Sequence, residues 1–233
     1  MFYKVFVPLL LVICGANAQR NIHERWEQQL EYFVAPNGLV NYKEWQKEQH
    51  ALRAYLQALE DHPPQTYWTT ANRKAYWINT FNAATIAKVL EHYPLQSVKD
   101  IDLFRDTVVF RINNQSMGLK SIENKLREMK DPRIHFALHR AAVSSPDLSR
   151  KVYRSNTLED QLEEATIKFL KDPDKNKFQE DIGRLSQLFQ WYCEDFGPPN
   201  GRLTFLQKYA CSVIGEKTKF QYLTFDWRLN EGL

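Results

Sequence analysis

The sequence predicts a helix-rich α+β fold with a small, mostly antiparallel sheet, formed by a single domain that follows a signal peptide. Apolar residues recur at helical spacing through most of the chain. Alternation of apolar and polar residues, which is typical of strands, is confined to a few short stretches. No internal repeat or low-complexity linker divides the chain, so one domain is expected.

Composition supports a packed domain and argues against a nucleic-acid partner. The 233 residues are 43% hydrophobic and 13% aromatic, which is enough to build a sizeable core. The formal net charge is only +3, and basic residues are interleaved with acidic ones along the chain. Nucleic-acid binders usually gather their basic residues on one face, so we predict no such partner.

Residues 1–18 have the three parts of a signal peptide. Lys4 supplies the positive charge, Val5–Ile13 the apolar core, and Ala16–Ala18 a small-x-small cleavage site. We therefore expect a secreted or periplasmic mature chain comprising residues 19–233. The apolar run is too short to span a membrane, and no later stretch is long enough.

Two cysteines, Cys193 and Cys211, remain after removal of the signal peptide. An oxidising compartment permits a disulfide between them, and two buried thiols on packed helices are the alternative. A zinc site built from cysteines is excluded because it needs more thiolates.

The first part of the mature chain is predicted to be helical. An apolar stripe that includes Trp26 and Leu30 precedes a turn at Asn37–Gly38, and a second helix ends at Pro63–Pro64. The next helix, residues 74–90, is apolar on nearly every side and should be central.

Asn79 and Asn82 lie three residues apart on this central helix and therefore face the same way. Buried amides must find hydrogen-bond partners. They either tie neighbouring loops to the helix or line a site.

The middle of the chain predicts a hairpin and a short helix. Residues 107–112 and 117–119 flank Asn113–Asn114, a typical hairpin turn. A helix over residues 121–127 would begin at Ser121. Glu123 and Arg127 are four residues apart on it and can form an ion pair.

The predicted site is centred on the stretch Asp131–Pro146. Ile134, Phe136 and Leu138 alternate with His135, Ala137 and His139, which predicts a strand with both imidazoles on one face. The strand leads into the polar loop Ser144–Pro146.

The C-terminal part is predicted to add three helices and a strand. Helices are expected over residues 158–170, 178–196 and 203–214, the last capped by Asn200. Alternation over residues 220–224 predicts a final strand.

Several stretches are shared with one family. They are Gly38–Tyr42, Ala75–Asn82, Leu119–Arg127, Asp131–Leu138, Phe205–Tyr209 and Tyr222–Asn230. In this order they resemble the domain of unknown function 547, found in bacteria and plants, over nearly all of the mature chain. The resemblance implies the extent of the domain and the position of a site.

The chain departs from the family where a nucleophile would be expected. Typical members continue the Phe-Ala-Leu motif with Asn-Cys and then Ser-Cys-Pro, whereas this chain has His139–Arg140 and Ser144–Pro146. Both family cysteines are missing, so we predict no thiol-dependent catalysis. The matching polar residues that remain are Asn79, Asn82, Glu123, Arg127, Arg133 and His135.

Serine chemistry is one interpretation of these residues. Ser145 or Ser144 would attack and His135 would be the base. The group that orients His135 would be Asn79, Asn82 or Glu123. A hydroxyl needs stronger activation than a thiol, and the chain has no Gly-x-Ser-x-Gly elbow.

A metal site at His135 and His139, with Glu123 or Asp131 as a further ligand, is disfavoured because the two histidines would be too far apart on a strand. Were the segment helical, the same spacing would suit zinc. On the predicted strand we instead expect one hydrogen-bonded core histidine and one surface histidine, and no metal or cofactor.

Anion binding is another interpretation. Arginines beside a polar loop hold carboxylates or phosphates, although structural pairing with Glu123 and Asp131 is the alternative. The predicted ligand-binding residues are Asn82, Arg127, Arg133, His139, Arg140 and Ser144.

These arguments favour a non-catalytic protein that binds an anionic small molecule or a peptide in a polar pocket around His135. The alternative is a hydrolase or transferase of the cysteine-hydrolase type, with Ser144 or Ser145 in place of the cysteine. A structural or interaction protein of the cell envelope is a third class.

Overall fold

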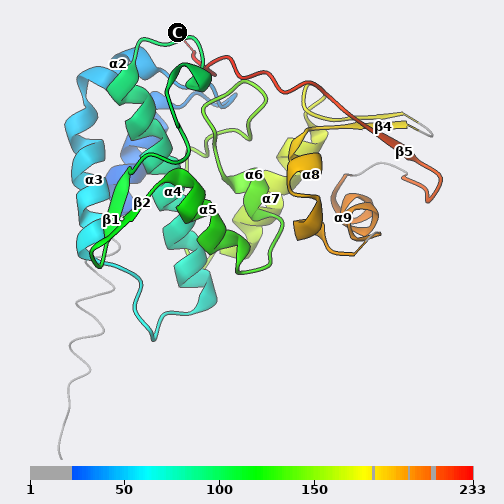
Figure 1. The fold of residues 1–233 in the computed structure, drawn as a ribbon, viewed down its shortest axis with the longest axis horizontal. Coiled ribbons are helices and arrows are strands. Elements are labelled where there is room, and N and C mark those ends of the chain that lie inside the picture. The colour runs from blue at the N-terminus through cyan, green and yellow to red at the C-terminus, as the bar shows by residue number, and fades with distance from the viewer. Residues whose placement is uncertain (1–22, 180–181, 199, 211–213, 233) are drawn as a thin grey trace, which may run out of the picture.

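The computed structural model describes residues 23–179, 182–198, 200–210 and 214–232. The predicted signal peptide, residues 1–18, lies outside this part of the chain. The described residues form a helix-rich structure with two small, mostly antiparallel sheets, which confirms the predicted α+β class (Figure 1).

Three helical segments form one side of the molecule. Residues 23–33 are helical, and α2 (Tyr42–Lys47) and α3 (Gln49–Asp61) follow. Their aromatic rings pack together, with the ring centroids of Trp26 5.2 Å from Tyr55 and 5.7 Å from Trp45. The periodic apolar residues seen in the sequence are therefore the core of this side.

Helix α4 (Thr70–His92) is central, as its all-round apolar sequence predicts. The side chain of Thr69 caps it by accepting a hydrogen bond from the backbone N–H of Asn72. Every residue from Lys74 to Ile86 is buried, and α2, α3 and α5 pack around the helix.

The predicted hairpin is confirmed. Strand β1 (Phe110–Ile112) pairs antiparallel with β2 (Gln115–Met117). The turn residues Asn113 and Asn114 both have positive φ angles, 46° and 63°, as two-residue hairpin turns with this twist require.

Helix α5 (Leu119–Arg127) begins two residues before the predicted cap at Ser121. Gly118 precedes it, and a Cβ atom there would lie 2.8 Å from the Arg105 carbonyl oxygen and 2.7 Å from that of Asp106. Only glycine allows this close approach, which anchors the backbone of Arg105 beside α5.

The predicted strand within Asp131–Pro146 is wrong: residues Ile134–Ala137 form the short helix α6. The turn at Pro132 starts it, because the backbone N–H of His135 donates to the Pro132 carbonyl and that of Leu138 to the Ile134 carbonyl. All residues from Ile134 to Ala142 are buried, so their apparent alternation did not separate an inner face from an outer one.

The next helix is confirmed, but the one after it is not. Helix α7 (Leu158–Lys171) occupies the predicted range. The predicted helix over 178–196 is wrong, because β3 (Lys177–Gln179) and β4 (Ile182–Leu185) occupy its first part. Of the described residues in this range, only α8 (Leu188–Trp191) and the 3₁₀ turn η2 (Cys193–Phe196) are helical.

Pairing with a distant strand explains the structure of β4. The predicted final strand is present as β5 (Lys219–Tyr222), and it lies parallel to β4. At Gly183 an added Cβ would lie 2.8 Å from the Phe220 ring, so the glycine lets the two strands meet. Helix α9 (Gly201–Tyr209) is shorter than predicted, since Ile214 is not helical and residues 211–213 lie outside the described part.

Two hydrophobic clusters meet at α6. Ile134 and Ala137 pack in the cluster around α4, whereas Phe136 packs in the cluster formed by α7, α8 and α9. In Figure 1 the segment after β5 returns across the molecule, and bridges link Arg228 to Ser97 and Glu231 to Val40. The stretch expected to carry the site therefore lies at the junction of the two clusters.

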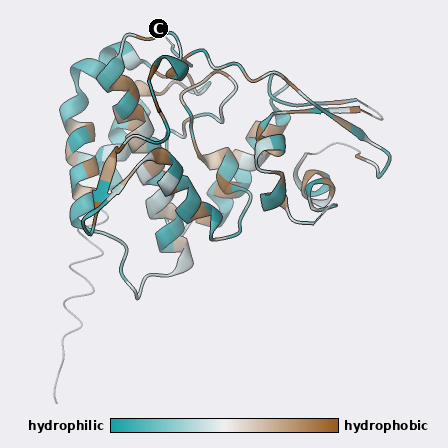
Figure 2. Ribbon diagram, in the orientation of Figure 1, coloured by the Kyte–Doolittle hydropathy of each residue, from teal (hydrophilic) through white to brown (hydrophobic). Residues whose placement is uncertain are grey.

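Hydrophobic and hydrophilic residues alternate along the helices (Figure 2). Among the residues that the structure describes, no helix is long and apolar enough to cross a membrane.

Candidate functional site

His135 lies on α6 and is completely buried. Its Nε2 is 2.8 Å from Oδ2 of Asp195 on η2, and its ring stacks on Tyr192 of the turn between α8 and η2. Within the described residues, Nδ1 has no hydrogen-bond partner. Burial lowers the pKa of His135, although the hydrogen bond to Asp195 acts in the opposite direction.

Asp195 connects two of the residues that the sequence singled out. Besides His135, it accepts a bidentate pair from Arg127, with Nε to Oδ2 at 2.6 Å and Nη2 to Oδ1 at 2.8 Å. Burial opposes ionisation of Asp195, but the hydrogen bonds from His135 and Arg127 outweigh it and lower its pKa. Sequence reasoning missed Asp195 because it lay within a predicted helix far along the chain.

Glu123 is the centre of a second, adjoining network. Its carboxylate accepts from Arg140 Nη2 at 2.6 Å through one oxygen and from Arg105 Nη2 through the other. The side chain is almost fully buried. Burial would raise the pKa of Glu123, but the charges of Arg140 and Arg105 lower it overall.

The two arginines differ in how many of their donors are used. Arg140 donates from Nη1 to the carbonyls of Leu138 and His135, and from Nη2 to Glu123 and the Tyr192 hydroxyl. All four Nη hydrogens are thus used within the protein. Among the described residues, Arg105 donates only from Nη2 to Glu123, and its side chain is 45% exposed. Arg105 therefore has donors that no described residue uses, whereas the Nη donors of Arg140 are taken up within the protein.

A cavity of about 230 Å³ lies against this network. The residues that line it are Phe81, Phe104, Arg105, Leu119, Arg140, Trp191, Tyr192 and Trp227. Trp191 and Trp227 stack with ring centroids 5.6 Å apart. The lining is thus apolar and aromatic with a few convergent polar groups, the usual composition of a small-molecule site. His135 lies behind its wall, stacked on Tyr192.

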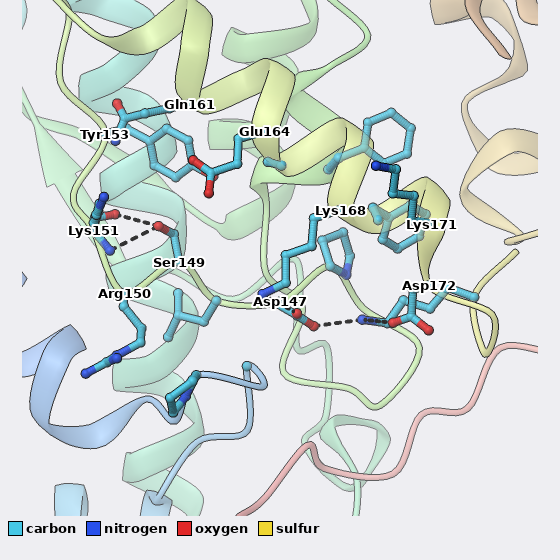
Figure 3. Close-up of a pocket in the computed structure, with 18 of the residues that line it drawn as sticks. Asp147, Ser149, Arg150, Lys151, Tyr153, Gln161, Glu164, Lys168, Lys171 and Asp172 are labelled. Atoms are coloured by element: carbon cyan, nitrogen blue, oxygen red, sulfur yellow. Dashed lines mark hydrogen bonds and ion pairs between the residues drawn. The ribbon is translucent and has the colours of Figure 1, made fainter. Parts of the chain in front are cut away.

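A larger cavity of about 540 Å³ lies between α7 and the loop that precedes it (Figure 3). Four of its charged residues form ion pairs: Asp147 accepts from Lys168 and Lys175, and Lys175 also pairs with Asp172. None of the residues predicted for the site lines it. The smaller cavity is the candidate site because the predicted residue Arg140 lines it and Glu123 pairs with both of its arginines.

Asn79 and Asn82 have structural partners. Asn79 exchanges two hydrogen bonds with the backbone of Tyr153, at 2.8 and 3.0 Å. Asn82 accepts from the N–H of His139 and donates to the carbonyl of Ala137. Both amides tie neighbouring segments to α4, which is the structural alternative that the sequence left open.

The serines are also bound to the backbone. Ser145 Oγ accepts from the N–H of Arg140 at 2.7 Å and donates to the carbonyl of Pro146 at 3.0 Å. Ser144 Oγ accepts from the N–H of Asp226. In the described part of the chain, neither hydroxyl is hydrogen-bonded to an imidazole.

His139 lies just after α6, which ends at Ala137, so only His135 of the two histidines is on the helix. Both histidines are completely buried, so the prediction of a surface histidine is wrong. Its Nδ1 is 2.8 Å from the Pro146 carbonyl oxygen and its Nε2 is 3.4 Å from the Tyr42 hydroxyl. No group of three potential metal-binding side chains occurs in the described residues.

Arg133 belongs to a separate ion-pair group with Asp131 and Glu159, and Lys74 also donates to Asp131. Burial would raise the pKa of Asp131, but the hydrogen bonds from Arg133 and Lys74 lower it to about 2. Arg133 therefore has the structural pairing that was the alternative to ligand binding.

The structure describes only one of the two cysteines of the mature chain. Cys193 is an exposed free thiol, so the alternative of two buried thiols is wrong for this residue. Cys211 lies outside the described residues.

Of three comparisons with known proteins, one found a match. No curated protein and no solved structure matches the chain. Residues 65–170 match the model of the family described as "Protein of unknown function, DUF547", a narrower range than the motif resemblance covers. The match includes Glu123, His135 and Arg140 but not Asp195 or Tyr192. Residues 65–170 of this chain thus form a DUF547 family domain.

Proposed function

We propose that the protein binds a small amphipathic anion, without turnover, in the cavity beside Glu123. The observation that carries this proposal is Arg105, which has donors that no described residue uses at the edge of a largely apolar cavity. Arg105 and Arg140 bring two positive charges and Glu123 brings one negative charge, so one positive charge is left over. A single carboxylate on the ligand would balance it.

The walls support an apolar or aromatic body for this ligand. Phe81, Phe104, Trp191 and Trp227 bring four aromatic rings to a small space. Aromatic side chains contribute large contact areas and preferred stacking geometries. An aryl-alkyl carboxylate satisfies both the walls and the charge.

The arrangement of the serines and His135 favours binding over hydrolysis. A serine nucleophile needs a base within hydrogen-bond reach. Ser145 is instead bound to the backbone on both its donor and acceptor sides, and His135 is paired with Asp195 behind Tyr192. The tripartite pattern of residues 1–18 supports export, so we propose that binding occurs outside the cytoplasm.

Intrinsic tryptophan fluorescence tests the proposal, because Trp191 and Trp227 line the cavity. Phenylacetate should bind, and its neutral analogue phenylacetamide should bind more weakly. Arg105→Gln should weaken phenylacetate binding roughly 10- to 100-fold, since a hydrogen bond to a charged group contributes about 1.5–3 kcal/mol. Arg53→Gln, at an exposed position on α3, is the matched control and should have no effect.

Equal binding of acid and amide, or unchanged binding to the Arg105 variant, would show that the cavity does not select an anion. Turnover of an ester that disappears in Ser145→Ala, with the fold intact, would establish the hydrolase alternative instead.

A further inference from the structure

Two buried polar atoms on α4 have no hydrogen-bond partner among the described residues: Thr85 Oγ1 and Lys88 Nζ. Thr85 is completely buried and Lys88 is only 4% exposed. The two residues are three apart on the helix and so lie on the same face. Buried polar groups are nearly always paired, so two unpaired neighbours require an explanation.

Neither residue lines the candidate cavity, and Lys88 lines a separate cavity of about 570 Å³, but each is linked to the candidate cavity by a residue that does line it. Phe81, four residues before Thr85 on the same helical face, lines the cavity. Lys88 Nζ lies over the ring of Phe104, 5.6 Å from its centroid, and Phe104 also lines the cavity. A single aromatic ring therefore contacts both the cavity and the unpaired ammonium group.

An unpaired ammonium group in this position is costly to the fold. Burying a charge without a partner is unfavourable, and one cation–π contact offsets only part of this cost. Burial lowers the pKa of Lys88, and the carboxylates of Glu91 and Asp106 only partly oppose this effect. Both of those carboxylates belong to exposed residues and are screened by solvent. A residue kept at such a cost fits a role in binding.

We propose that Thr85 and Lys88 form a second polar subsite, which receives a carboxylate at the far end of the ligand held by Arg105. This inference rests on the proposed function and specifies the ligand class as a dicarboxylate with an apolar middle. Counting Lys88 with Arg105, Arg140 and Glu123 leaves two positive charges, which match a dianion.

Phe104 must rotate aside for the two subsites to join. It lies in the loop of residues 101–109, where Leu103 is 70% exposed and has a φ of 50°. A bulky residue at positive φ is strained, and such strain is common where a segment moves on binding. The ring thus separates the two subsites until a ligand long enough to reach Lys88 displaces it.

The test compares phenylacetate with 1,4-phenylenediacetate, which carries a second carboxylate across the ring. Calorimetry would measure both probes on wild type, Lys88→Met, Thr85→Val and Arg105→Gln. We expect the diacid to bind wild type at least about tenfold more tightly than the monoacid, because it gains a second charged hydrogen bond. The ratio of the monoacid Kd to the diacid Kd should fall to near one in Lys88→Met and be reduced in Thr85→Val.

Lys99→Met is the matched control. Lys99 Nζ also lies over a wall ring, 5.1 Å from the centroid of Trp227, but Lys99 is exposed. The ratio should be unchanged in this variant. Lys88→Met removes an unpaired buried ammonium group, so its melting temperature should not fall; Lys88→Arg provides a charged alternative in case it does not fold.

The outcomes separate the two proposals. If the monoacid binds through Arg105 but the diacid gains nothing, or keeps its gain in Lys88→Met, the second subsite is refuted and the proposed function stands. If only the diacid binds, and does so through Lys88, the subsite stands and the role of Arg105 is refuted. If neither probe binds wild type, both proposals are overturned.

Discussion

The ring of His135 stacks on that of Tyr192, with the centroids 4.0 Å apart and the planes inclined by 21°. His135 belongs to the DUF547 family domain. Tyr192, which lies more than fifty residues after His135 in the sequence, is outside that domain and lines the candidate cavity. The histidine that the sequence marks as central therefore supports the site from behind. Its partner Asp195 holds the imidazole in place from the same segment as Tyr192.

This arrangement predicts a pH dependence of folding. Burial lowers the pKa of His135. It also lowers the pKa values of His23 and His139, in both cases to about 4. In the unfolded chain each imidazole gains its proton near pH 6.5. Below that pH the unfolded state therefore binds more protons than the folded one, and the free energy of unfolding should fall as the pH drops from about 6.5 towards 4.

Urea unfolding between pH 4 and 8 would check this dependence. His139→Gln should remove on the order of 3 kcal/mol of the change between these limits, since one pKa unit corresponds to about 1.4 kcal/mol. The exposed His62→Gln should leave the slope unaltered. A stability that is flat from pH 7 to 5 would contradict the prediction.

Asn79→Leu should destabilise the fold by about 1–3 kcal/mol, because the N–H and carbonyl of Tyr153 would lose their partners in a buried place. Equilibrium denaturation gives the measurement. Asn124→Leu, on the exposed face of α5, is the control and should change stability much less. Equal stability of wild type and the Asn79 variant would mean that the amide does not hold the Tyr153 segment.

Gly118→Ala should both destabilise the protein and weaken ligand binding at Arg105. The new Cβ would clash with the carbonyls of Arg105 and Asp106, which forces the loop away from α5. Gly215→Ala is a close control, because nothing lies within 4 Å of a Cβ there. Thermal unfolding and phenylacetate titration of both variants would reveal whether the close packing at Gly118 positions Arg105.

Ser145→Cys tests whether the loop at the missing family cysteine is arranged for nucleophilic chemistry. Ser145 is 2% exposed and bonded to the backbone, so the introduced thiol should react with iodoacetamide at least about tenfold more slowly than the exposed Cys193. Peptide mapping after a timed reaction distinguishes the two positions. Faster labelling than that of a cysteine in an unfolded peptide would instead indicate an activated thiol and favour the hydrolase alternative.

Export predicts a mature chain that begins at Gln19. Mass spectrometry of the exported protein should find this residue, in free or cyclised form, at the N-terminus. Ala18→Arg should block cleavage and serves as the comparison. Recovery of an intact chain starting at Met1 from the cytoplasm would overturn the prediction.

The sequence by itself determined the elements whose signals are local. The apolar composition around α4 predicted its central position, and two asparagines that accept positive φ predicted the β1–β2 turn. Helix α7 also followed from its own periodicity. In each case a residue's neighbours along the chain set its conformation, so a short window carried enough information.

Tertiary structure decided the rest. Segment 134–142 is buried on all sides, so its pattern has no solvent face from which to read a period, and the turn at Pro132 selected a helix. Strand β4 exists because β5, more than thirty residues later, pairs with it across Gly183. The site depends on the same kind of contact: Asp195 and Tyr192 reach His135 because its neighbour Phe136 packs in the same hydrophobic cluster as Tyr192. Burial of apolar surface drives that packing, and it is insensitive to separation along the chain, so no local pattern encodes which polar groups it brings together.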